Sequence, residues 1–231
     1  MFRRLVTASA IVGAGLMVAG CAVQPLKLGA AAILGNQRIS VATLNGEVTN
    51  LSQSAKQYPG VVTLTATEET QSTLTWLIRY QINEELARQA GITISPAQAQ
   101  LALRQAYDNA TVSAEQEGLT NVTPNLILTA SGIPPNTANE LGRYEAITNA
   151  YVKMANGGTT PASGSAAETA ADNKFVKAEC TAAKALNIQV NPQFGQLDYS
   201  QYQVVTSPSA VTRTQGPVKA AASSSATAPA C

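Results

Sequence analysis

Apolar residues recur at every third or fourth position along several stretches of the chain, a spacing typical of helices with one buried face. The longest stretch covers residues 68–90, with Thr67 as a candidate N-cap and Gly91 where a left-handed terminal residue is favoured. Trp76 and Tyr80 form an i,i+4 pair beside its apolar stripe. The wide apolar arc predicts that this helix lies at the centre of the core. The stripe itself consists of Leu74, Leu77, Ile78, Ile82 and Leu86.

Further helices are expected where a Ser or Thr precedes such a stripe, because the hydroxyl accepts a free backbone N–H of the first turn. Ser40 opens one of them. Ser95 opens another, with Pro96 at the first helical position and Gln98 able to bond back to the cap. The remaining helices are expected over about residues 124–131, 137–155 and 167–186, the last with Phe175, Val176, Cys180 and Ala183 facing inward.

Short apolar runs outside the helices predict a few strands. Residues 31–34 are followed by the turn residues Gly35 and Asn36 and then by Ile39, which indicates two short strands. Residues 188–190 form a third candidate strand, which we expect to pair with residues 31–34 although the two are remote in sequence. Residues 202–205 are a further extended candidate. The fold class predicted is mainly α, an irregular bundle of five to six helices with a small two-stranded β element.

The N-terminus carries the pattern of an exported protein. Arg3 and Arg4 precede 16 uncharged residues, fewer than the roughly 20 that a membrane-spanning helix needs. Residues 16–21 read Leu-Met-Val-Ala-Gly-Cys, which resembles a bacterial lipobox. The resemblance implies cleavage before Cys21, lipid on its thiol and a location on the extracytoplasmic face of the cell membrane. The alternatives are a simple signal peptide cut elsewhere and a transmembrane anchor.

These patterns divide the chain into four parts. Residues 1–20 are the expected lipoprotein signal peptide and residues 21–30 a spacer after the lipidated cysteine. Residues 31–205 form one helical domain, with a flexible linker of Gly, Ser, Thr and Pro at residues 156–166. Residues 206–231 are dominated by Ala, Ser, Thr and Pro, and we expect this tail to be disordered because it buries too little apolar surface.

Composition excludes several classes of function. The 15 basic and 14 acidic residues give a net charge of +1, and loss of Arg3 and Arg4 on cleavage leaves 13 against 14, or −1. No basic patch favours nucleic acid. The chain has no His, which removes the commonest general base and metal ligand, and it has no Cys-x-x-Cys and no Gly-rich phosphate loop. We expect no enzyme activity, no cofactor, no metal and no nucleic-acid partner.

Cysteines, paired glutamates and aromatic residues are the remaining candidates for a functional role. Export would allow Cys180 and Cys231 to form a disulfide, but Cys180 is more simply a small apolar residue packed in its helix. Glu68-Glu69 and Glu84-Glu85 are interpreted as solvated helix faces, because adjacent helical residues do not face each other. The aromatic residues either line an apolar binding surface or fill the core, and their spacing favours the core: Trp76, Tyr80, Tyr107, Tyr144 and Tyr151.

Three segments, taken in order, resemble the N-terminal domain of SurA and PrsA, exported chaperones often fused to a parvulin prolyl isomerase. The first is residues 31–40, a short apolar strand, a Gly-Asn turn, an Ile and a capped helix. The second, residues 74–95, resembles the long second helix and the capped start of the third. The third, residues 186–195, ends in Asn-Pro-Gln-Phe-Gly, where Gln193 stands at a position usually held by Arg. The resemblance covers about residues 31–198.

The chain departs from that family where the isomerase would lie. A parvulin domain of about a hundred residues belongs between the N-terminal helices and the last helix. Here that position holds only residues 156–166, and the His residues of the parvulin site are absent. The resemblance therefore implies a helical chaperone-like domain folded from two separated stretches, without isomerase activity.

Two hypotheses about function follow from the resemblance and the lipobox. In the first, the protein is a membrane-anchored, extracytoplasmic lipoprotein that binds unfolded or newly exported polypeptides without catalysis. In the second, it is a scaffold lipoprotein that holds one fixed partner in a cell-envelope complex. A chaperone needs a broad apolar cradle and a scaffold needs a compact patch with a rigid hot spot. The sequence does not predict the oligomeric state, because no heptad run demands a coiled coil.

Overall fold

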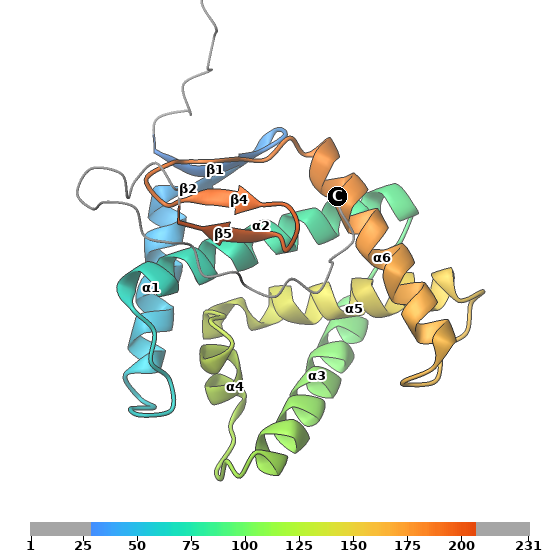
Figure 1. Ribbon diagram of the computed structural model, residues 1–231, viewed down its shortest axis with the longest axis horizontal. Coiled ribbons are helices and arrows are strands. Elements are labelled where there is room, and N and C mark those ends of the chain that lie inside the picture. The colour runs from blue at the N-terminus through green and yellow to red at the C-terminus, as the bar shows by residue number, and fades with distance from the viewer. Residues whose placement is uncertain (1–28, 207–231) are drawn as a thin grey trace, which may run out of the picture.

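The protein's structure is a computed structural model that describes residues 29–206, and Figure 1 shows its helices and strands. The predicted signal peptide, Cys21 and all but the first residue of the predicted tail lie outside this range. The fold is mainly helical, as predicted, with six α-helices and a small amount of β structure. Among the described residues, no helix combines the length and apolar character needed to span a bilayer.

The central helix α2 (Ala66–Ala90) begins two residues earlier than predicted. Its N-cap is Thr65, not Thr67: the Thr65 hydroxyl accepts from the backbone N–H of Glu68, and a Glu68 carboxylate oxygen accepts from the Thr65 N–H at 2.7 Å. This reciprocal capping box satisfies two free donors at once, so it outweighs a cap two residues later. The helix ends at Gly91 with φ of 67°, the left-handed conformation that was predicted.

The three-stranded sheet joins the two ends of the described chain. Strands β1 (Ala30–Leu34) and β2 (Gln37–Ser40) form a hairpin, and β3 (Gln189–Val190) pairs antiparallel with β1. The predicted long-range pairing is therefore confirmed, with Ala32 opposite Val190. The side-chain amide of Asn191 adds a bond to the Ala30 carbonyl oxygen at 3.0 Å.

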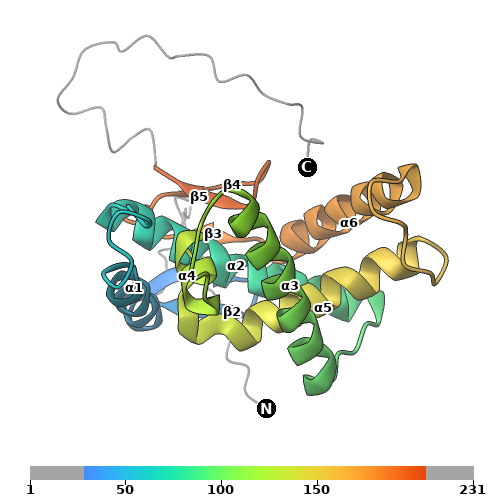
Figure 2. The ribbon, with the colours of Figure 1, turned by 90° about the horizontal axis from the view of Figure 1, so that it is seen from below.

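A second hairpin was only half predicted. Strand β5 (Gln203–Val205) lies within the extended segment expected at residues 202–205, but its partner β4 (Gln196–Asp198) is a polar strand that no apolar run signals. The hairpin packs on α2, where the backbone N–H of Val204 donates to the buried Thr75 hydroxyl at 2.9 Å. Figure 2 shows the hairpin on one side of α2 and β2 on the other, with β3 on the hairpin side.

The other helices surround α2. They are α1 (Val41–Ala55), α3 (Pro96–Gln116), α4 (Pro124–Ala130), α5 (Ala138–Ala155) and α6 (Ala166–Ala185), with a short 3-10 helix η1 (Pro135–Thr137) before α5. The predicted caps Ser40 and Ser95 each accept a backbone N–H of their helix, and Thr123 does the same for α4. The segment predicted as a linker joins α5 to α6, and Ser165 caps the latter.

Two apolar clusters form the core. The larger one unites β1, α2, α6 and the β4–β5 hairpin, and its fully buried members include Leu34, Leu74 and Ile147. The smaller one lies where α2, α4 and α5 meet, around Tyr80, Leu128 and Leu141. Because the first cluster holds residues from both ends of the described chain, α6 and the strands after it complete the domain.

Candidate functional site

The aromatic residues singled out in the sequence are brought together in the smaller core cluster. The ring centroid of Trp76 lies 5.9 Å from that of Tyr80 and also 5.9 Å from that of Tyr144. Tyr107 packs against the same cluster. Tyr80 is buried, its hydroxyl is 3.2 Å from that of Thr137, and burial raises its pKa above the usual value. These rings therefore fill the core, the role that their spacing favoured. Tyr151 lies apart, half-buried against Phe175 at 5.8 Å.

Trp76 stands at the edge of this cluster. It is half-buried, the Arg79 guanidinium stacks over its ring at 5.2 Å, and its indole N–H donates to the carbonyl oxygen of Ser131 at 3.4 Å. Ser131 is the C-cap of α4. The indole thus connects the central helix to the end of α4, where the apolar core meets an open groove.

The groove lies between α3 and α4 and has a volume of about 390 Å³. Figure 1 shows the two helices converging from α5 toward the loop that joins them, and we call residues 105–131 the α3–α4 arm. Val61, from the loop after α1, forms one edge of the groove. The lining is almost wholly apolar: Val61, Ala110, Ala114, Leu119, Val122, Leu126, Ile127 and Ala130, with Ser113, Glu117 and Ser131 as its polar members.

The packing of α3 explains why this groove stays open. Near its start α3 lies so close to α5 that a Cβ on Gly142 would stand 2.6 Å from the Ala99 carbonyl oxygen. Farther along, α3 leaves the body of the protein, and Ala102 is its single buried residue. Leu119 is 37 % exposed and Val61 is 48 % exposed, values that are high for apolar side chains facing a hollow. The groove therefore presents apolar surface without a partner inside the described chain.

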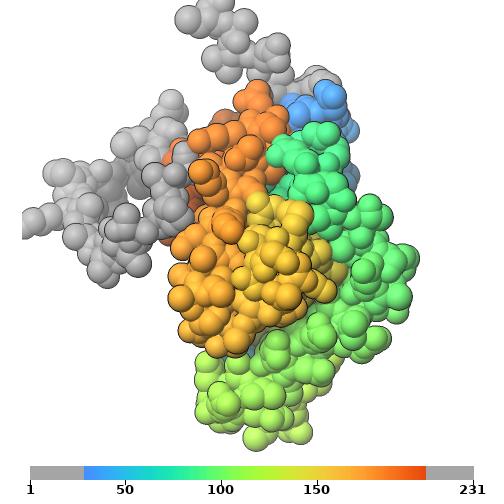
Figure 3. All heavy atoms as spheres, turned by 90° about the vertical axis from the view of Figure 1, so that its right-hand side faces the viewer, coloured from blue at the N-terminus to red at the C-terminus, as the bar shows by residue number. Residues whose placement is uncertain are grey.

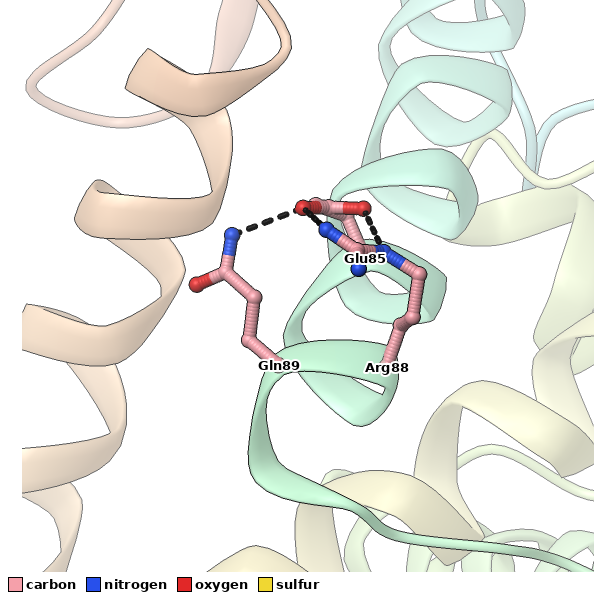
Figure 4. A network of polar contacts seen from close by, with 3 residues as sticks. All are labelled: Glu85, Arg88 and Gln89. Carbon is pink, nitrogen blue, oxygen red and sulfur yellow. Dashed lines mark hydrogen bonds and ion pairs between the residues drawn. The ribbon is translucent and has the colours of Figure 1, made fainter.

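The paired glutamates serve the helices rather than a reaction. Glu84 forms an ion pair with Arg143 of α5, whose second guanidinium nitrogen lies 2.9 Å from the carboxylate. Glu85 accepts from Arg88 at 2.8 Å and from Gln89 at 2.7 Å along the same helix (Figure 4). The two carboxylates therefore turn away from each other, as their adjacency predicts, although each has a cation partner that the sequence interpretation did not supply.

Sequence reasoning missed a buried carboxyl on α6. Glu179 is only 8 % exposed, and it replaces the apolar residue that the predicted stripe of α6 calls for. Burial raises its pKa to about 7, against the opposing effects of the Arg79 guanidinium and a hydrogen bond with Tyr144. The carboxylate in turn helps burial to raise the pKa of Tyr202, in the turn before β5, to about 12. A carboxyl group whose pKa is close to neutral pH thus lies between α2, α5, α6 and the hairpin.

Cys180 differs from its expectation in one respect. It is half-buried against the larger core cluster, as expected, but it is disulfide-bonded rather than a free thiol. The cysteine that bonds to it lies outside the described residues. The predicted lipidation residue, Cys21, also lies outside them.

Comparison of the chain with protein-family models, with curated proteins and with solved structures finds no match in any of the three. The function proposed below therefore depends on the geometry and chemistry of the site. Within residues 29–206, no three His, Cys, Asp or Glu side chains lie close enough to hold a metal ion. What the α3–α4 groove offers chemically is burial of apolar side chains beside a few polar groups, the chemistry of a binding site.

Proposed function

We propose that this protein is a lipid-anchored chaperone that holds unfolded or newly exported polypeptides at the extracytoplasmic face of the cell membrane without chemical catalysis. The observation that carries the proposal is the α3–α4 groove, an apolar hollow with exposed Leu119 and Val61 at its edges. Residues 16–21, with their lipobox pattern, supply the proposed anchor.

The chemistry of the groove suits clients of varied sequence. Apolar burial is non-directional and scales with area, so a groove lined by Ala, Leu, Ile and Val accepts many apolar side chains. Its volume of about 390 Å³ falls in the range of sites that enclose a small molecule or a few side chains. An extended segment would place such side chains in the groove and leave its remaining backbone in water. Binding of this kind is weak and reversible, as a chaperone that releases its clients requires.

Suppression of aggregation tests this proposal. Residues 22–231, which lack the lipid but keep the whole mature chain after Cys21, should reduce light scattering by an unfolding model protein at stoichiometric amounts. The double variant Val61→Ser with Leu119→Ser, which makes the two exposed large apolar residues of the groove polar, should lose most of that effect. Aggregation that proceeds unchanged with the unaltered chain would rule out the chaperone.

A matched control separates the groove from general surface stickiness. Leu101 and Met154 are exposed to similar degrees, 49 % and 47 %, and lie outside the groove. The double variant Leu101→Ser with Met154→Ser should suppress aggregation as well as the unaltered chain does. Equal loss in both double variants would assign binding to exposed apolar surface in general. Crosslinking in cells that captured one recurrent protein rather than many would instead favour the scaffold.

The anchor makes a separate prediction about the cysteines. The chain has three, and lipid on the Cys21 thiol leaves only Cys231 to bond with Cys180. Non-reducing peptide mapping of the mature protein should therefore recover a linked pair of peptides containing Cys180 and Cys231, together with an acylated N-terminal peptide. A Cys21–Cys180 link would contradict the lipid anchor directly.

A further inference from the structure

The α3–α4 arm carries acidic side chains and no basic ones. Between Gln105 and Gly142 the sequence has no Lys or Arg, whereas Asp108 and Glu115 lie in the outer half of α3 and Glu117 is its C-cap. All three are exposed, and Glu117 lines the groove itself. Glu117 therefore places a negative charge at the border of the apolar hollow, and Glu115 lies two residues before it, whereas Asp108 lines a different hollow next to α5.

Glu115 and Glu117 stand at the C-terminal end of α3, where carboxylates are least favourable. The C-terminal end of a helix carries a partial negative charge, which cations stabilise and carboxylates oppose. Three described helices obey this rule, with Arg88, Lys153 and Lys184 in the last turns of α2, α5 and α6. The last turn of α1 has no basic residue, but its C-cap is Lys56. The last turn of α3 has no basic residue and ends beside Glu115 and Glu117.

The rest of the described chain does not neutralise this charge. The ion pairs within residues 29–206 are Glu85–Arg88 and Glu84–Arg143, so no described cation pairs with Asp108, Glu115 or Glu117. Lys56, the C-cap of α1, precedes the loop that carries Val61 but forms no ion pair with them. A local arrangement that opposes helix stability without compensation inside the fold is expected where a site serves a partner.

A second hollow has cations rather than carboxylates in its lining. Lys174 and Lys177 border this hollow, which has a volume of about 500 Å³ and lies between α2, α5 and α6. Figure 3 shows α5 and α6 side by side, with the arm projecting below them. The α3–α4 groove therefore differs from this second hollow in the sign of the charge at its border.

We propose that the α3–α4 groove selects apolar polypeptide segments flanked by Lys or Arg. The apolar side chains enter the groove while the cations lie over the C-terminal end of α3, against Glu115 and Glu117. This inference rests on the proposed function and narrows it, because it names the charge that a bound segment carries. Opposite charges at the border select partners and speed their encounter more than they add affinity, so the preference is a matter of specificity.

Two peptides that differ only in charge test the proposal. Both share one Trp-free apolar core, and one ends in two Lys while the other ends in two Glu. Binding to residues 22–231 is followed by the fluorescence of Trp76, the single Trp of the chain. We expect the Lys peptide to bind about three- to ten-fold more tightly at low salt, since two partly exposed charge contacts contribute that much. In 0.5 M NaCl the difference should largely vanish.

Variants of the arm complete the experiment. Glu115→Gln with Glu117→Gln should abolish the preference and leave the domain folded by circular dichroism, with no loss of thermal stability because both carboxylates oppose the helix dipole. The control Glu69→Gln with Asp172→Asn removes the same net charge from α2 and α6 and should keep the preference.

Each failure has its own meaning. Equal binding of the two peptides would overturn the charge preference and leave the chaperone intact. No binding of either peptide would overturn both. Salt-sensitive self-association by analytical ultracentrifugation, lost in the Glu115→Gln, Glu117→Gln variant, would show that a second copy occupies the arm, which would also overturn the proposal.

Discussion

Helices α3 and α6 are almost equal in length, at 21 and 20 residues, yet they differ in how much of their surface is buried. The inner face of α6 buries five residues against α2, α5 and the hairpin, among them Phe175 and Ala182. One residue of α3, Ala102, is buried, and its outer half borders a groove. The contrast places most of the buried core in the region that α6 closes, and it supports our proposal that the arm binds clients, because apolar surface left unburied by folding is available to a partner.

The largest expected effect comes from truncating the filled region. Leu74 is fully buried in the larger core cluster, so Leu74→Ala should lower the free energy of unfolding by about 2–5 kcal/mol. Leu119→Ala, on the exposed edge of the groove, should change it by no more than about 0.5 kcal/mol. Urea denaturation followed by circular dichroism measures both. A loss at Leu119 comparable to that at Leu74 would show that the arm is part of the folding core, and the contrast would fail.

The buried carboxyl of α6 makes stability in the closed region depend on pH. The folded state holds Glu179 with its pKa raised from 4.5 to about 7, so folding favours the protonated form. The contribution of this group is therefore most favourable below pH 4.5 and declines as the pH rises toward 7, by on the order of 3 kcal/mol. The groups that face it are Arg79 on α2, Tyr144 on α5 and Tyr202 before β5.

Glu179→Gln keeps the shape and removes the titration. Its free energy of unfolding should lose most of the decline between pH 4.5 and 7 and exceed that of the unaltered protein at pH 8. Glu145 of α5, whose pKa burial also raises, accounts for the slope that remains. Urea melts at several pH values measure the difference, and parallel curves for the two proteins would show that Glu179 is not the group responsible.

Substitutions at two glycines test the close approach of α3 to α5, beyond which the arm begins. The Cβ of Gly142→Ala would meet the Ala99 backbone at 2.6 Å and the Leu103 Cβ at 2.9 Å, which should cost about 1–3 kcal/mol. Gly46, on the exposed side of α1, has open space around it, so Gly46→Ala should stabilise by about 0.5–1 kcal/mol through helix propensity. Thermal melts that moved in the same direction for both variants would contradict the close approach of α3 and α5.

Much of the fold follows from local signals in the sequence. The caps at Ser40 and Ser95 and the pairing of residues 188–190 with β1 were predictable, because hydroxyl caps act locally and short apolar runs pair with one another. The start of α2 is also encoded locally, because Thr65 and Glu68, three residues later, have the spacing of a capping box, which Thr67 lacks. Strand β4 was missed because its sequence, Gln-Leu-Asp, is mostly polar.

The candidate site was much less predictable. Trp76 and Tyr80 were identified as core residues, but the groove beside them depends on where α3 diverges from α5, which no periodicity records. Glu179 was missed because a charged residue interrupts the apolar stripe of α6 and looks solvated until the hairpin covers it. The sequence shows that there are no basic residues between Gln105 and Gly142, but only the structure shows that this segment borders a groove.

Hydrogen exchange of residues 22–231, with and without an unfolded client, tests most directly whether the arm is the binding surface. The account predicts that the client slows exchange of amides along the outer half of α3 and in α4, and leaves those of α6 unchanged. Slower exchange in α6, with the α3–α4 arm unaffected, would contradict it.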